Sequence, residues 1–164
     1  MPRKRWHTSA QLREFTEELH KQTDRGAGIV AAAVLEDALE TTIEQRLLEL
    51  SADRREKLFG RLAPLSTFSA KIELGFALGL FSNEGRKALD MIRDVRNKFA
   101  HEMKIITFDD PGIEALIRKA KPARMSNNST PRDSFLALFY QSLNLLYLEQ
   151  SRDIRLKSNV TALL

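Results

Sequence analysis

The chain has 164 residues, a net charge of +4 and no cysteine, and 43% of its residues are hydrophobic. This length and composition are typical of one globular domain with its own core and exclude a disordered chain. The lack of cysteine excludes disulfides, thiol catalysis and zinc sites built on thiolates, and it favours a cytoplasmic location.

The chain begins with a basic arm, residues 1–8, which contains Arg3, Lys4 and Arg5. Polar residues follow the arm, so we expect no secretory signal, which would continue into an apolar stretch. The longest apolar run, Leu74 to Phe81, is too short to span a bilayer. We therefore expect no association with a membrane.

From residue 9 onward, apolar residues recur at helical spacing, and no alternating pattern indicates a strand. The spacing predicts helices over residues 9–23, 27–50, 67–78, 83–101, 113–120 and 132–152, with a short helix or turn over 53–62. Gly26 and Gly28 indicate a break between the first two helices. Gly79 is expected to end the helix over 67–78, with Leu80 as its apolar contact, and Ser82 to cap the next helix.

The chain is less regular after residue 101. A short extended stretch is expected over residues 105–108, and a flexible loop over 121–131, where serine and asparagine gather. The final helix is apolar around most of its circumference, which is typical of a helix buried in a core or at a subunit interface. We therefore predict an all-α protein, a compact bundle of about five to seven helices over residues 9–155 with a tail over 156–164, that forms a homodimer.

A second basic segment lies late in the chain, and no acidic residue interrupts it. It contains Arg118, Lys119, Lys121, Arg124 and Arg132. Together with the basic arm, this segment is a candidate surface for the phosphates of a nucleic acid. Charged runs of this kind also occur where side chains contact only solvent, and the sequence leaves both interpretations open.

The candidate site is at the end of the helix over 83–101, which has an arginine, an amide and an imidazole in its last six residues. Arg93, Asn97 and His101 are four residues apart and share a face, and Arg96 lies between that face and the apolar stripe. Histidine titrates near neutral pH and can act as a general base, and the guanidinium of arginine binds phosphate. This set suits the binding or cleavage of a phosphodiester. In the alternative interpretation, Arg96 pairs with an acid of a neighbouring helix and His101 stabilises the helix C-terminus.

The region from about residue 26 to residue 120 resembles the mannitol operon repressor family. The resemblance rests on the stretches 66–80 and 88–102, with their Lys-Ile-x-Leu, Leu-Gly-Leu and Arg-x-x-x-x-His elements, and on Thr-Phe-Asp-Asp at 107–110. The Arg-Asn-x-x-x-His motif is also similar to that of the HEPN families of small helical bundles. Many HEPN proteins are metal-independent endoribonucleases or toxins that act as dimers, and others only bind nucleotides or RNA. Carried over by position, Arg96, Asn97 and His101 would be the active-site residues.

The resemblance leaves two functions open. One is a bacterial regulator, a repressor of an operon, that acts through protein or nucleic-acid binding. The other is an endoribonuclease or toxin, in which Arg96 holds the phosphate, His101 acts as general base and Asn97 orients the histidine. A helix-turn-helix around Gly79 is not expected, because the second helix is best patterned on its apolar face and mixes acids with lysines on its polar face.

The sequence contains no pattern for a metal or cofactor. Its three histidines, His7, His20 and His101, are scattered, and no glycine-rich loop is present that could hold a phosphate. We therefore expect neither a metal nor a cofactor.

Overall fold

The computed structural model describes residues 9–120 and 129–152, and for residues 9–13 only the backbone. Within these ranges the chain forms seven helices and no strand: α1 (Ser9–Lys21), α2 (Asp24–Arg46), α3 (Ala52–Phe59), α4 (Phe68–Ala77), α5 (Asn83–His101), α6 (Pro111–Ala120) and α7 (Pro131–Ser151). The predicted all-α bundle is therefore confirmed. None of the described helices combines the length and the apolar character needed to cross a membrane.

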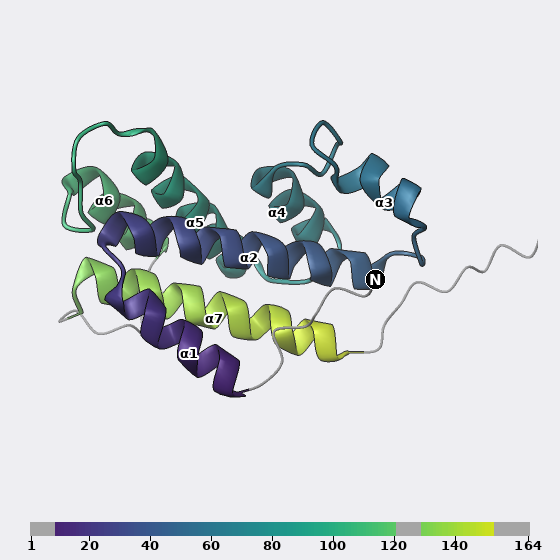
Figure 1. The fold of residues 1–164 in the computed structure, drawn as a ribbon, viewed down its shortest axis with the longest axis horizontal. Helices are drawn as coiled ribbons and strands as arrows, with labels where there is room; N and C mark the ends of the chain where they lie inside the picture. The colour runs from purple at the N-terminus through teal and green to yellow at the C-terminus, as the bar shows by residue number, and fades with distance from the viewer. Residues whose placement is uncertain (1–8, 121–128, 153–164) are drawn as a thin grey trace, which may run out of the picture.

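Helices α2 and α7 lie side by side along the long axis of the molecule (Figure 1), and both pack against α5. Helices α3 and α4 lie together near one end, and α6 lies near the other. Helix α5 also contacts α4 and α6, so it is surrounded by four other helices. Its buried side chains are Ala88, Leu89, Met91, Ile92, Val95 and Phe99, as its apolar stripe predicts.

The predicted break at Gly26 and Gly28 is wrong, because both glycines lie inside α2. The helix begins at Asp24, and the Thr23 side chain caps it by accepting the N–H of Gly26 at 3.1 Å. Gly28 is needed for packing: a Cβ there would lie 2.5 Å from Cδ2 of Phe99. Gly28, which was predicted to break the helix, therefore lies where α2 and α5 pack closely together.

The connection from α4 to α5 agrees with the prediction. Gly79 has a φ of 69°, its N–H donates to the carbonyl of Phe76 at 2.9 Å, and the N–H of Leu80 donates to that of Gly75 at 3.0 Å. These two bonds form a Schellman motif, and Leu80 is buried as its apolar contact. Ser82 caps α5 by accepting the N–H of its third residue at 3.3 Å.

Residues 105–108, where a short extended stretch was predicted, form no strand and belong to the loop between α5 and α6. The loop is anchored by Phe108, whose side chain is only 1% exposed. The centre of its ring lies 5.2 Å from that of Phe99 and 4.8 Å from that of Phe135. The backbone N–H of Phe108 donates to the carboxylate of Asp24 at 2.9 Å. The loop is thus held by aromatic packing and by the first residue of α2, and it pairs with no neighbouring strand.

Helix α7 is buried mainly by its own chain. Its apolar side chains pack against α2, α5 and α6, and the Phe139 ring lies 6.2 Å from the ring of Phe15 in α1. Two large apolar side chains of α7 remain exposed, Leu145 at 36% and Leu148 at 58%. The apolar circumference that suggested a homodimer is therefore explained largely by burial within one chain.

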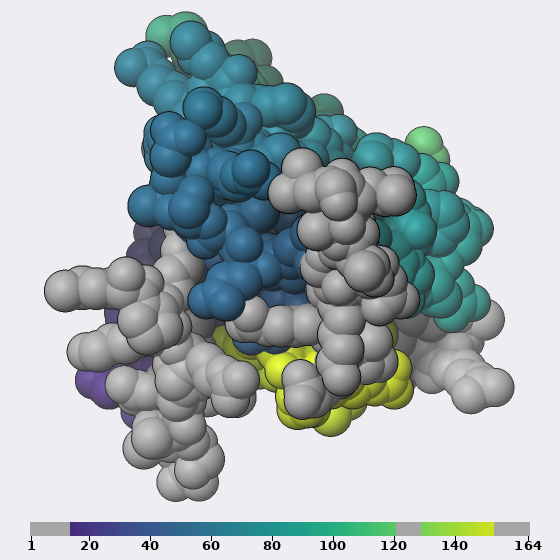
Figure 2. Space-filling view, turned by 90° about the vertical axis from the view of Figure 1, so that its right-hand side faces the viewer, coloured from purple at the N-terminus to yellow at the C-terminus, as the bar shows by residue number. Residues whose placement is uncertain are grey.

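A charged network joins α2 to α3 and α4. Glu36, Glu40 and Glu44 lie one turn apart on α2. The Lys71 ammonium of α4 lies 2.9 Å from Glu36 and 2.8 Å from Glu40, with only 6% of its side chain exposed. Arg55 of α3 pairs with Glu40 and Glu44 and thereby holds α3 against the bundle. Figure 2 faces this end of the molecule, where α3 lies at the surface.

Candidate functional site

The candidate site lies at the C-terminal end of α5, where the sequence placed it. The helix spans Asn83–His101, as predicted, and the backbone N–H of its C-cap, Glu102, donates to the carbonyl of Lys98 at 3.0 Å. The Arg25 guanidinium of α2 donates to the carbonyl of Glu102 at 2.9 Å and to that of Lys104 at 2.6 Å. The end of α5 is therefore fixed to α2 by a cation, which the carbonyl end of a helix favours.

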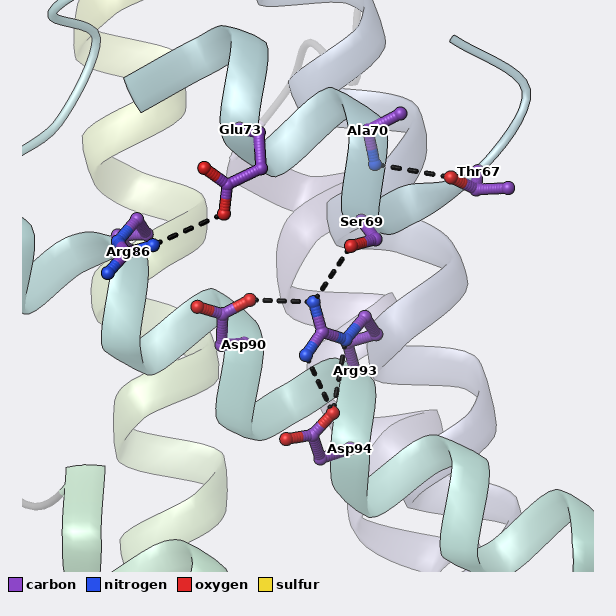
Figure 3. Close-up of polar contacts among 8 residues, drawn as sticks. All are labelled: Thr67, Ser69, Ala70, Glu73, Arg86, Asp90, Arg93 and Asp94. Atoms are coloured by element: carbon purple, nitrogen blue, oxygen red, sulfur yellow. Dashed lines mark hydrogen bonds and ion pairs between the residues drawn. The ribbon is translucent and has the colours of Figure 1, made fainter. Parts of the chain in front are cut away.

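Arg93 is not available to bind a phosphate, because it is occupied by neighbouring groups (Figure 3). Its guanidinium donates to Asp90 at 2.7 Å and to Asp94 at 2.8 Å on α5, and to the hydroxyl of Ser69 on α4 at 3.2 Å. Burial raises the pKa of the Asp90 carboxyl, although the nearby arginines oppose this shift. Arg93 therefore fixes α4 against α5 and neutralises two acids.

Arg96 lies on the side of α5 that faces α2. Its Nη1 donates to Oδ1 of Asn97 at 3.0 Å, and its Nη2 lies 4.0 Å from Oε2 of Glu36. The side chain is 40% exposed. Glu36 is held more closely by Lys71, so Arg96 is at most weakly paired and stays accessible from solvent.

Asn97 and His101 lie in an open groove between α5 and α6. The groove has a volume of about 450 Å³, and its walls also include Asp94, Lys98, Glu102 and Leu116. Arg96 does not line it. At about 100° of rotation per residue, five positions along a helix separate Arg96 from His101 by about 140° around the axis. In one copy of the chain, the amide of Asn97 and the imidazole of His101 therefore share the groove, whereas the guanidinium of Arg96 lies on a different side of α5.

Two apolar side chains directly after α5 were not identified from the sequence as part of a site. Met103 is 97% exposed and Ile105 is 96% exposed. We call Arg96, Asn97 and His101, together with Met103 and Ile105, the end surface. The only signal in the sequence was that Met103 keeps the spacing of the apolar stripe, four residues after Phe99, beyond the last residue of the helix.

The two basic segments can be placed only in part. Arg3, Lys4, Arg5, Lys121 and Arg124 lie outside the described residues. Arg118 and Lys119 are exposed on α6 and can contact a ligand.

Arg132, the last basic residue of this segment, is bound within the fold. It pairs with Asp24, it donates to the carbonyls of His20 at 3.2 Å and Gln22 at 2.9 Å, and its guanidinium lies 5.9 Å from the centre of the Phe108 ring. Its role is to hold the start of α7 against the junction of α1 and α2.

No group of three or more His, Asp or Glu side chains that could hold a metal ion occurs among the described residues. No family model, curated protein or solved structure matches the chain. Function must therefore be argued from the site itself.

Proposed function

We propose that this protein is a regulator of the kind implied by its resemblance to the mannitol operon repressor family, and that it acts by binding a protein partner at the end surface. The observation that carries this proposal is the exposure of Met103 and Ile105, which are almost fully exposed and follow the exposed His101 by two and four residues. Exposed apolar side chains beside polar groups are typical of protein interaction sites.

The packing of α5 supports recognition without a helix-turn-helix. This helix packs its apolar face against α2, α4, α6 and α7, and its polar face carries Asp90 and Asp94, which do not suit a recognition surface in the major groove. The charges of the groove favour a protein over a nucleic acid as the partner. Besides Asn97 and His101, its charged lining consists of Lys98, of Glu102 and of Asp94, which Arg93 neutralises, so the groove has no excess of positive charge to attract a phosphate backbone.

The proposal is tested by affinity purification from cells with paired variants of the end surface. We expect Met103→Ser/Ile105→Ser and Arg96→Ala/His101→Ala each to lose the same co-purifying protein. The matched control is Leu62→Ser, because Leu62 is 96% exposed in the loop between α3 and α4. Retention of the partner by all variants, or recovery of only nucleic acid that high salt releases, would contradict the proposal.

A second candidate function is a metal-independent endoribonuclease. The hydrogen bond between Arg96 and Asn97, together with the exposure of His101, favours it. Because Arg96 and His101 diverge around the helix, this function depends on a homodimer in which the second copy supplies the missing group. In such a site arginine would stabilise the charge on the phosphate and histidine would take the proton of the attacking hydroxyl.

The two candidates separate in one assay, the cleavage of labelled cellular RNA in the presence of EDTA. An endoribonuclease loses cleavage in both Arg96→Ala and His101→Ala at unchanged thermal stability, whereas a protein-binding regulator cleaves in no form. A DNA-binding repressor would differ from both, since it would keep a salt-dependent shift of operator DNA in these variants. It would lose that shift when Arg3, Lys4 and Arg5 are neutralised.

A further inference from the structure

A pocket that the candidate site does not use lies at the opposite end of α5. It has a volume of about 370 Å³ and is formed by the first turns of α5, the last turn of α6 and the middle of α7. This volume is within the range of roughly 300–1,000 Å³ that is usual for small-molecule sites, near its lower limit. The pocket therefore suits a small ligand.

The inner wall of the pocket is apolar. Leu89, Leu138 and Leu146 line it and are each at most 2% exposed, so they belong to the hydrophobic core. Leu145 also lines the pocket and is one of the few large apolar side chains with substantial exposure, 36%. A ligand with an apolar body would remove this surface from water, which is favourable in proportion to the area buried.

Two lysines, Lys87 of α5 and Lys119 of α6, line the same pocket, against one acid, Glu84. Both lysines are exposed, and neither forms an ion pair with another described residue. Two other acids of α5, Asp90 and Asp94, share a smaller adjoining hollow with these lysines but are both bound by Arg93. The lining therefore combines an apolar wall with an excess of positive charge.

We propose that this pocket binds a small amphipathic carboxylate. The aliphatic or aromatic body of the ligand lies against the leucines of α5 and α7, and its carboxylate lies between Lys87 and Lys119. Because α5 runs from this pocket to the end surface, a ligand here contacts the same helix that presents Arg96 and His101.

The test is a titration of the isotope-labelled full chain with octanoate, followed by amide chemical shifts. Octan-1-ol and octylamine serve as probes of the same length with a neutral or a positive head. We expect octanoate to shift the amides of the pocket residues and to bind more tightly than octan-1-ol, with octylamine the weakest. Absence of octanoate binding at millimolar concentration, or equal affinities for octanoate and octan-1-ol, overturns the proposal.

Two variants locate the site. Lys87→Gln/Lys119→Gln should weaken octanoate roughly two- to thirtyfold, the range for two partly exposed ion pairs, and leave octan-1-ol unchanged. The matched control is Lys21→Gln/Lys104→Gln, which removes the same charge outside the pocket and should bind octanoate as the wild type does. Equal weakening in both double variants would mean that net charge alone attracts the probe, and this overturns the proposal.

This site does not depend on the proposed function of the end surface. Loss of octanoate binding in the Lys87→Gln/Lys119→Gln variant is measured without any partner, and partner capture is measured without octanoate. Failure of either experiment therefore leaves the other result intact.

Discussion

Replacing Lys71 by methionine is the sharpest test of how this bundle is held together. The Lys71 ammonium is 2.9 Å from Glu36 and 2.8 Å from Glu40, and the side chains of Lys71 and Glu40 are only 6% and 9% exposed. Methionine keeps the apolar length of the side chain and removes the charge. The substitution therefore leaves two carboxylates that have lost their shared partner.

The expected loss of unfolding free energy follows from the burial of this ion pair. Removing one partner of a buried ion pair costs about 3–5 kcal/mol, because the remaining charge is left without compensation. Glu36 keeps 21% exposure and Glu40 keeps its pair with Arg55, so the cost should lie at the lower end, about 3 kcal/mol. For a protein of this size, such a loss lowers the melting temperature by roughly 6–12 °C.

The assay is urea unfolding at neutral pH, with Lys57→Met as the matched control. Lys57 lies 2.8 Å from Asp53, the same separation, but these side chains are 73% and 75% exposed. We expect this control to cost about 0.5 kcal/mol or less, because water already solvates both charges. Equal costs for the two lysine variants would refute the argument from burial.

A second comparison identifies the origin of the cost. If the stability is lost because buried carboxylates have no positive partner, Lys71→Met/Glu36→Gln should be more stable than Lys71→Met alone, because it removes one uncompensated carboxylate. If lost packing is the cause, the double variant should be no more stable than the single one, and the electrostatic explanation fails.

The pH dependence gives an independent check. Burial lowers the pKa of the Lys71 ammonium, but hydrogen bonds and charges from Glu40 and Glu36 outweigh this, so its pKa is raised above 10.5. A raised pKa means that the stabilisation is complete below pH 10.5 and is lost as the pH rises through the folded-state pKa. The difference in unfolding free energy between wild type and Lys71→Met should therefore shrink as the pH rises through that alkaline range.

Three further predictions follow from single features. Burial, with a smaller effect from a nearby aspartate, raises the pKa of Tyr147 to about 12, so in Tyr140→Phe the remaining phenol should titrate near that value by ultraviolet absorbance. Gly28→Ala should destabilise by about 1–3 kcal/mol despite its better helix propensity, because its methyl meets Phe99, and Phe99→Leu in the same chain should recover part of the loss in thermal unfolding. Arg132→Lys should lower the free energy of unfolding in urea by about 1–2 kcal/mol, because an ammonium cannot keep both the ion pair with Asp24 and the bonds to the backbone carbonyls. A loss near zero would show that one of these contacts is enough.

Local signals in the sequence determined the helices of this protein. The bounds of α5, its Ser82 cap and the Gly79 turn were all predictable, because an apolar stripe and a cap depend on residues within a few positions of one another. The candidate residues Arg96, Asn97 and His101 were found in the same way, as a pattern on one helix.

The tertiary structure decided which of these residues have partners. Arg93 and Arg96 are three residues apart on one helix, yet Arg93 is bound by two acids and Arg96 remains accessible. Gly28 looked like a break until the ring of Phe99 was placed against it. The acid stripe of α2 was visible in the sequence, but its partner Lys71 lies on another helix. Such contacts join residues far apart in the chain, so they depend on how helices cross, which no local pattern specifies.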